Sequence, residues 1–575
     1  MEPVAKRGRS EMWEHFNLIS PNKVQCLVCH QQLAYNNNTS SMLRHFRAKH
    51  EAGQAAASIR GDRKAKIDEA LVNMIVQDSQ PFKVVDDQGF RALVSLLDPT
   101  YVLPSRQTLK SMMEARYREE KQKAKDKVQK ATAVALTSDM WTSIHMDSYL
   151  AFTCHFVDEE DKLATVLLAV AKFGERHTAS NIATVKGSIL EEWEIPKAKV
   201  MCLTTDGASN MHLCSSIMEV RHSHCIAHAL NLVVKKALKL TPGLEEVRTK
   251  ARDIATYFRT STVARERLLC LQNQMGGPTN KLIQEVDTRW NSTLDMLQRL
   301  YEQREPVGAA LASLQTDVAP LTSNQYHSIS QCISLLAPLK EATVELSAEK
   351  HVSGSKIIPL VKMLRHIIAT KQRQLTDEMA RDLAKHLLTL TSEKLGNYEV
   401  AGQHALATLL DPRFKTMGFC NTTHQQNGVK KLMAECATVI RQKTPDPAPS
   451  DDPTPSTSHD APSTSDSSGL WELLDAQVLE KRKVKSATAN ASVETNRYLA
   501  EPNIPRNEDP LEYWVKHKHV YPHLFVLARN LLCIPASSVP CERVFSKAGE
   551  IVSKKRNRLN PSTVEKIVFL NKNRF

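Results

Sequence analysis

The stretch Thr137-Ser-Asp-Met-Trp-Thr-Ser143 decides how this chain is expected to fold, because it places Asp139 directly after a short apolar run. Residues 133–136 predict a buried strand, and a carboxylate at the end of such a strand is costly unless a cation meets it. Val200-Met-Cys-Leu-Thr-Thr-Asp206 repeats the pattern, and Glu542 stands at the expected start of a helix. Two strand-end aspartates and a helix-borne glutamate are what a two-metal phosphoryl-transfer site needs. Taken singly, each aspartate fits an ordinary strand end or turn equally well.

The elements around these aspartates predict a mixed sheet. Residues 149–157 alternate apolar and polar, residues 163–170 form a third strand-like run, and the acidic segment 158–161 predicts a hairpin between them. A helix over 178–193 and the strand ending at Asp206 follow. Three strands, a helix and a fourth strand, with aspartates on the first and fourth, resemble the ribonuclease H-like fold.

Composition favours a polyanionic partner. The chain has 575 residues and a net charge of +13, with basic residues spread along its length. Such a charge favours nucleic acid, although many basic nuclear proteins bind no specific DNA. The 12 cysteines stand mostly isolated, and no apolar run has the length of a membrane span or signal peptide. We therefore expect a reducing compartment, no membrane partner, and nuclear import or DNA contact through basic clusters at 6–9 and 554–558.

A second motif lies near the N-terminus. Cys26-x2-Cys29 and His45-x4-His50, fifteen residues apart, form a Cys2His2 set that predicts a zinc site. A segment this short has too little core to fold without its metal. The spacing, with Trp13 and Phe16 ahead of the knuckle, resembles a BED-type zinc finger. The helix would close its core with Met42, Leu43 and Phe46 and leave three cations, Arg44, Arg47 and Lys49, to contact double-stranded DNA. Protein contacts are the alternative use of such a finger.

Five further motifs resemble the hAT superfamily of transposases, the hobo and Activator lineage, and especially its BED-finger subgroup with domesticated members. They are residues 138–142 (SDMWT), 205–210 (TDGASN), 224–228 (HCIAH), 287–291 (DTRWN) and 536–546 (ASSVPCERVFS). Each fragment is weak alone, but their order covers nearly the whole chain. The resemblance implies that Asp139, Asp206 and Glu542 are catalytic and hold Mg²⁺ or Mn²⁺ for DNA cleavage and strand transfer.

The resemblance also implies roles in DNA positioning for residues outside the acidic set. Trp290, beside Arg289, is expected to stack on a flipped base when a hairpin forms on flanking DNA. Cys225 and His228 are expected near the active site. The alternatives are a core tryptophan and, for Cys225-x2-His228, structural support at the start of an apolar helix, which the helical pattern from Ala229 onward favours.

The predicted architecture is multidomain α+β: a BED finger and a split ribonuclease H-like core interrupted by a large helical insertion. The expected boundaries are 1–55 (finger), 60–130 (helical DNA-binding or linking domain), 131–236 (core, first part), 237–504 (insertion, with 444–469 disordered), and 505–575 (core, second part, with the hAT dimerisation region). The last block implies a homodimer or larger homo-oligomer, unless its apolar residues instead complete the core.

Two functions follow from these expectations. The first is a cut-and-paste transposase that binds DNA through its zinc finger. The second is a domesticated, nuclear, DNA-binding regulator of transcription without transposition activity. Some relatives of this kind are described as SUMO ligases, but no separate ligase motif stands in the sequence. A pure structural adaptor is a third, weaker reading.

Overall fold

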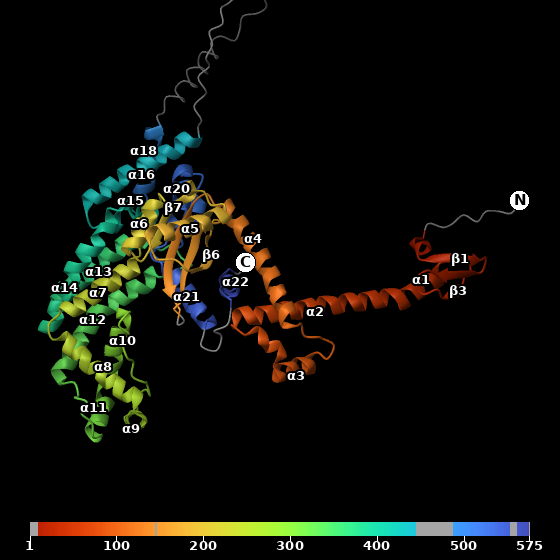
Figure 1. Cartoon of the computed structure of the whole chain (residues 1–575). Coiled ribbons are helices and arrows are strands. Elements are labelled where there is room, and N and C mark those ends of the chain that lie inside the picture. The colour runs from red at the N-terminus through yellow and green to blue at the C-terminus, as the bar shows by residue number, and fades with distance from the viewer. Residues whose placement is uncertain (1–9, 144–145, 444–486, 553–559, 574–575) are drawn as a thin grey trace, which may run out of the picture. The chain divides into compact units, whose positions relative to one another are not determined.

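A computed structural model describes residues 10–143, 146–443, 487–552 and 560–573 of the chain (Figure 1). The basic clusters at 6–9 and 554–558 and the segment 444–469 therefore lie outside the described residues. The chain divides into two compact units, residues 1–118 and residues 119–575. Each unit is built from local elements that the sequence pattern explains.

The first unit begins with a small antiparallel sheet in the order β1-β2-β3. Its elements are β1 (Phe16–Ser20), β2 (Lys23–Cys26), β3 (Gln32–Ala34), α1 (Ser40–Phe46) and a π-helical turn (Arg47–Glu51). Phe16, Val24, Met42 and Phe46 form its core, with Trp13 packed against them. Leu43 is only half-buried, so the prediction that it belongs to this core is wrong, and Val24 belongs there instead.

Helices make up the rest of the first unit. They are α2 (Ala52–Gln77), α3 (Gln88–Leu97) and α4 (Arg106–Lys130), and α4 continues into the second unit. On α4, Lys121 and Lys125 pair with Glu192 and Glu194 at 2.6 Å each. The charged second half of α4 is therefore largely neutralised by carboxylates of the unit that it enters.

The second unit is built on a mixed five-stranded sheet in the order β6-β5-β4-β7-β8. The strands are β4 (Val134–Thr142), β5 (Ser148–Val157), β6 (Leu163–Phe173), β7 (Val200–Thr205) and β8 (His222–His224). The first three are antiparallel neighbours, whereas β7 pairs parallel to β4 and β8 parallel to β7. Helix α5 (Ala179–Glu192) connects β6 to β7, as expected. Strand β4 runs three residues past Asp139, so this residue lies inside the strand rather than at its end.

The described residues between 226 and 509 form helices and turns and contribute no strand. The helices are α7 (Ile226–Leu240), α8 (Leu244–Thr260), α9 (Thr262–Gln274), α10 (Trp290–Glu302), α11 (Arg304–Ser313), α12 (Ser323–Leu346), α13 (Ile357–Gln372), α14 (Glu378–Leu395), α15 (Gly402–Leu410), α16 (Thr422–Lys443) and α18 (Ala487–Ala500). Leucines and alanines at helical spacing on α7, α12, α13 and α14 share one core. Within the described chain, none of the helices combines the length and apolar character needed to cross a bilayer.

The C-terminal helices return to the sheet. They are α19 (Pro510–His517), α20 (Pro522–Leu532), α21 (Val539–Ile551) and α22 (Pro561–Lys572). Figure 1 shows α21 and α22, in blue, beside the orange and yellow strands, where α21 packs on β4 and β5 and α22 on β6. The side chain of Asn573 receives a hydrogen bond from Leu167 N–H (2.8 Å) and donates one to Leu167 C=O (2.9 Å). The apolar residues of this block are thus used inside the fold.

Candidate zinc finger and candidate acidic site

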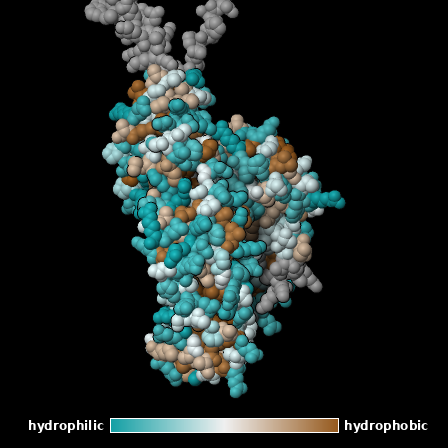
Figure 2. All heavy atoms as spheres, turned by 90° about the vertical axis from the view of Figure 1, so that its left-hand side faces the viewer, coloured by the Kyte–Doolittle hydropathy of each residue, from teal (hydrophilic) through white to brown (hydrophobic). Residues whose placement is uncertain are grey.

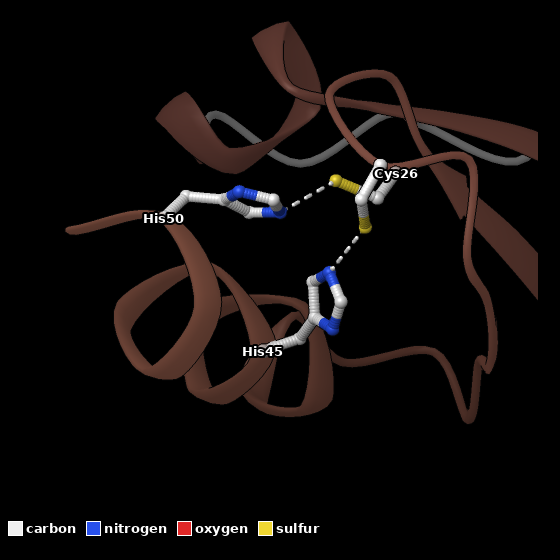
Figure 3. Close-up of side chains that lie close together, drawn as sticks. Cys26, His45 and His50 are labelled. Carbon is white, nitrogen blue, oxygen red and sulfur yellow. Dashed lines mark hydrogen bonds between the residues drawn. The ribbon is translucent and has the colours of Figure 1, made fainter. Parts of the chain in front are cut away.

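The four predicted zinc ligands converge. The ligand atoms of Cys26, Cys29, His45 and His50 all lie within 4.8 Å of one another. Cys26 Sγ is 3.3 Å from His50 Nε2, and Cys29 Sγ is 3.2 Å from His45 Nε2. A tetrahedral zinc ion with ordinary bond lengths would hold such S and N atoms about 3.5 Å apart. Figure 3 shows both imidazoles pointing toward the cysteine knuckle. The arrangement fits Zn²⁺.

The backbone between the two histidines explains how residues five apart reach one ion. On a regular α-helix they would lie about 140° apart around the axis. Helix α1 ends at Phe46, and Arg47–Glu51 form a π-helical turn, whose hydrogen bonds span five residues. The wider turn brings His50 round to the face of His45. Burial, together with the charges of His50 and Lys49, lowers the pKa of His45, which favours the neutral imidazole that binds metal.

Three cations of α1 and the π-helical turn lie at the surface of the finger. Arg44, Arg47 and Lys49 are exposed, and the first two line a hollow of about 550 Å³ with Ser40 and Leu43. This is the surface that the sequence predicts for contact with DNA phosphates or bases. Their role in DNA binding remains a prediction.

The parallel register of β4 and β7 places the two aspartates together. Thr137 pairs with Thr204. Asp139 lies two residues further along β4, and Asp206 lies two residues beyond Thr204, directly after β7 ends at Thr205. An even offset keeps both side chains on one face of the sheet, and neighbouring strands are about 4.8 Å apart. The two carboxylates therefore lie at the same edge of the sheet.

Burial and charge act together on Asp139. Its Oδ1 accepts a hydrogen bond from Met140 N–H at 2.8 Å. Desolvation raises the pKa of Asp139 to about 7, and the negative charges of Asp206 and Glu542 add to this increase. The effect of both carboxylates on Asp139 means that all three acidic groups share one electrostatic environment.

Helix α21 brings Glu542 to the same strands. The thiol of the preceding residue, Cys541, lies 3.2 Å from Thr137 Oγ1 and 3.8 Å from the carbonyl of Ala151, so the helix is anchored against β4 and β5. Glu542 itself is 42% exposed, and its Oε2 lies 3.7 Å from Arg289 Nη2. Among the described residues, the finger supplies the only group of three or more side chains that converges closely enough to hold a metal ion, and the three acidic residues are not such a group.

A glycine determines how closely a neighbouring side chain packs behind the second aspartate, Asp206. Gly207 has φ +81°, and a Cβ at this position would lie 2.0 Å from Cε1 of His224. Only glycine lets this imidazole pack directly behind Asp206. The Asp-Gly pair is therefore more than an ordinary turn, because Gly207 lets the imidazole of His224 on β8 pack next to Asp206.

Two residues that the resemblance assigned to DNA lie inside the protein. Cys225 is fully buried, and its Sγ accepts a hydrogen bond from Ser538 N–H at 3.3 Å, which favours the structural alternative for this residue. Trp290 is 3% exposed in the helical core, and its backbone N–H donates a hydrogen bond to Asn231 Oδ1 at 3.1 Å. Neither face of this indole is open to a base in this structure, which favours the core alternative.

The other two residues of this group remain accessible. Arg289 is 72% exposed and faces Glu542. His228 is half-buried at the start of α7, with its ring 6.2 Å from that of His224. Both lie beside the acidic residues, where the resemblance places them, and their contact with DNA remains a prediction.

Sequence reasoning missed a buried cation beneath the acidic site. Lys186 of α5 is 0% exposed, and its Nζ lies 3.6 Å from Met211 Sδ. Its charge acts on Asp139, whose pKa it lowers. The signal was present in the sequence, because Lys186 occupies an apolar position in the helical series Ile182, Ile189 and Leu190.

Four family models match separate parts of the chain. They are described as BED zinc finger (residues 10–51), ZBED1 RNase-like domain (137–229), ZBED1 RNase-like helical domain (223–334) and hAT family C-terminal dimerisation region (494–574). The matches include the four zinc ligands, the stretch with both aspartates, and α21 with Glu542. Their order along the chain is the order that the sequence predicts.

Relatives that match nearly the whole chain are named as a BED zinc finger protein, a putative transcriptional regulator and a putative transposase. "Zinc finger BED domain-containing protein 4" of Homo sapiens is 27% identical over 100% of this chain and 52% of its own length. "Putative transcriptional regulator tpeD" of Talaromyces stipitatus is 24% identical over 98% of this chain and 71% of its own. "Putative AC transposase" of Zea mays is 25% identical over 98% of this chain and 76% of its own. The chain thus spans about half the length of the first of these relatives.

These matches agree with the geometry. The finger has its ligands in place, the RNase-like match covers the mixed sheet, and the dimerisation match covers the helices that return to it. The chain is therefore a BED zinc finger relative of the hAT transposases.

Proposed function

We propose that this chain is a nuclear DNA-binding hAT-type transposase, in which Asp139, Asp206 and Glu542 form the site of metal-dependent DNA cleavage and strand transfer. The observation that carries the proposal is the parallel register of β4 and β7, which sets Asp139 and Asp206 side by side while α21 packs on β4 and β5. Residues more than 400 positions apart are thereby gathered at one edge of one sheet.

The architecture in this proposal is a ribonuclease H-like core in two parts. The five-stranded sheet and α5 would form the first part, and α20 to α22 the second, with the helices between residues 237 and 504 as an insertion. The packing of α21 and α22 on the sheet supports this division. The dimerisation match supports a homodimer or larger assembly.

The donor set fits Mg²⁺ or Mn²⁺. Both ions prefer carboxylate oxygens. Burial is the main reason for the raised pKa of Asp139, and the negative charges of Asp206 and Glu542, which add to it, are what a divalent cation would offset. When bound, such ions activate the attacking water or 3′-hydroxyl and stabilise the leaving oxygen. The protein's own part is to hold Asp139 rigidly within β4, to fix Asp206 against His224, and to present Glu542 on a helix anchored by Cys541. Zn²⁺ would serve the finger, which delivers the DNA.

The alternative is a domesticated regulator of transcription that binds DNA through the same finger without cleaving it. Two observations favour it. Glu542 faces Arg289 at 3.7 Å, and the three acidic residues are not among the described side chains that converge closely enough to hold a metal ion. One relative is also named a putative transcriptional regulator.

An excision assay separates the two functions. DNA that flanks the gene is placed around a marker, and excision is compared in cells that express the wild type, Asp139→Asn or Glu542→Gln. We expect both variants to lose more than about a hundredfold, because even outer-shell metal partners are typically worth 10–100-fold. Asp317→Asn, at an exposed site remote in sequence from the three acids, is the matched control and should excise normally.

Two results would overturn the transposase. One is absence of excision by the wild type while zinc-dependent binding to a specific DNA sequence is intact, which would leave the regulator. The other is excision that survives in both variants, which would remove the three residues from the reaction.

A further inference from the structure

Helix α7 begins at the acidic site and leads away from it. Its N-cap, Cys225, is bonded to Ser538, the residue just before α21. His228, in its first turn, lies beside His224, which packs against Gly207 next to Asp206. One end of α7 is therefore tied to the elements that carry Asp206 and Glu542.

The exposed side of α7 carries cations in a line. Lys235, Lys236 and Lys239 are exposed, while the intervening Val233, Val234, Ala237 and Leu238 are buried. At 100° per residue, His228, Lys235 and Lys239 fall within about 40° of one another around the helix. From His228 to Lys239 the ridge runs about 16 Å along the axis, away from the acidic residues.

Helix α14 packs along α7 and extends the same surface. Lys394 shares a hollow of about 330 Å³ with Ala229 and Leu232, near the first turns of α7. His386 of α14 lies with its Nδ1 3.3 Å from Thr241 Oγ1, just after α7 ends. Figure 2 looks onto the side of the molecule that carries α14 and shows mostly hydrophilic side chains there. We call Lys235, Lys236, Lys239 and Lys394 the lysine track.

The charges of the lysine track are left uncompensated by ion pairs. Within the described residues, no carboxylate oxygen lies within 4.0 Å of any of these four lysines, although Asp382 and Glu393 stand on the same helix as Lys394. The lysines of α4 differ, since Lys121, Lys125 and Lys130 all pair with carboxylates at 2.6–2.8 Å. Unpaired like charges on adjacent helices repel one another, and a polyanion relieves that repulsion.

We propose that the lysine track binds the phosphate backbone of duplex DNA as the duplex leaves the acidic site. The proposal rests on the proposed function for the class of its ligand, and it adds a second DNA surface to that of the finger. Contacts with phosphates position DNA without reading its sequence, so the track would hold any flank in register with the carboxylates. Because α7 starts at the acidic site and the lysines follow along it, DNA bound to the track would run away from that site.

The test is the salt dependence of DNA binding by the full chain. His45→Ala and His50→Ala together silence the finger, and in this background Lys235→Gln, Lys236→Gln and Lys239→Gln are combined. Binding to a duplex of arbitrary sequence is followed by fluorescence anisotropy between 50 and 200 mM salt. We expect the slope of log K against log[salt] to fall by about 2–3, since each phosphate contact contributes about 0.9.

Matched variants distinguish the effect of removing the lysine track from the effect of removing the same positive charge elsewhere on the protein. Lys162→Gln, Lys197→Gln and Lys516→Gln remove equal charge from side chains that are 63–73% exposed elsewhere. They should leave the slope within about 0.5 of the parent, and arginine at positions 235, 236 and 239 should restore binding. Equal losses in both glutamine sets, or no loss in either, would overturn the proposal. So would competition by polyglutamate as strong as that by DNA of equal charge, which would point to an acidic protein partner.

The same experiment distinguishes failure of the track from failure of the proposed function. If the wild type excises nothing and the track variant still loses its salt slope, the transposase fails and the track stands. If the wild type excises and the track variant keeps its slope, the track fails alone. Unchanged thermal midpoints in the glutamine sets would show that both are folded.

Discussion

Lys186 is the residue whose chemistry is most at odds with its position. Its ammonium is wholly buried between α5 and α6, 6.0 Å from the centre of the Phe152 ring and 3.6 Å from Met211 Sδ. Desolvation lowers its pKa, and the favourable charge of Asp206 does not offset that burial. A lowered pKa means that the charged form is less stable in the fold than in water, so the charge opposes folding.

Lys186→Met should therefore stabilise the metal-free protein. Methionine has a similar length, and apolar replacement of buried charges is often worth about 1–4 kcal/mol. The measurement is the urea midpoint in the presence of a chelator, with Lys197→Met as a surface control that should shift the free energy of unfolding by less than about 0.5 kcal/mol. A clear loss of stability in Lys186→Met alone would show that the ammonium holds the acidic residues together. Either outcome measures what this buried cation contributes to the site.

For individual residues, the sequence predicted the chemical role of a side chain better than it predicted whether that side chain is buried. The zinc ligands and the proximity of Asp139 to Asp206 follow from spacing and strand order. The burial of Cys225 and Trp290 does not, because it depends on contacts with Ser538 and Asn231, which come from remote segments. Family motifs mark both positions without saying whether a side chain points to DNA or to the core.

Among the structural elements, the zinc finger depends most on a component that the chain does not supply, its metal ion. Its core contains five buried residues, including the ligand Cys26, and a segment of this size cannot offset the entropy of folding by itself. Its helix changes from α to π between the two histidines, a geometry that has a use only if both imidazoles meet one ion.

Removal of zinc should unfold the finger and leave the second unit folded. We expect one zinc per chain by elemental analysis, and rapid proteolysis within residues 10–51 after chelation. Cys29→Ser should behave like the chelated protein, whereas His30→Ala, next to it and outside the ligand set, should keep its zinc. A finger that resists protease without metal would mean that its apolar core suffices.

Element types were largely predictable, and their ends were less so. The alternation in residues 149–157 and the apolar run at 163–170 gave β5 and β6 closely. At the start of α22, Asn560 accepts a hydrogen bond from Ser562 N–H (3.1 Å) and Pro561 is the first helical residue. Strand β4 is longer than predicted because residues 139–142 pair with 148–151. Helix α21 runs past Gly549 and ends at Ile551, although a glycine commonly follows the end of a helix. The three-residue β8 has too short a pattern to detect.

For the whole molecule, the return of the C-terminal helices is the feature that local patterns could not supply. That Glu542 belongs beside Asp139 came from the resemblance, since nothing in residues 536–546 states which strands they will meet. The structure resolves one choice that the sequence left open. The apolar residues of α19 and α20, such as Trp514 and Tyr521, are buried within the chain's own core. Any self-association of this region must therefore use other side chains.

The buried histidines make a further property of the whole second unit predictable. His155 and His404 are both almost wholly buried, and burial lowers the pKa of each to about 4. For His155 the charge of Glu349 acts in the opposite direction and that of Lys572 in the same direction, while burial alone acts on His404. Between pH 4 and the unfolded value of about 6.5, the unfolded chain binds more protons than the folded one, so stability is complete above pH 6.5 and is lost as the pH falls.

Between pH 7.5 and 5.5 each histidine should cost the fold about 1 kcal/mol, because the unfolded side chain becomes mostly protonated while the buried one does not. His404→Gln should therefore reduce the fall of the thermal midpoint over this range, whatever it does to the midpoint at pH 7.5. His519→Gln, at an exposed position on the same unit, is the control and should leave the fall unchanged. If His404→Gln lost stability on acidification as steeply as the wild type, His404 would have to take up a proton while still folded. The Ser223 hydroxyl, 2.9 Å from His404 Nε2, is the group that would then have to accept a hydrogen bond from the imidazolium.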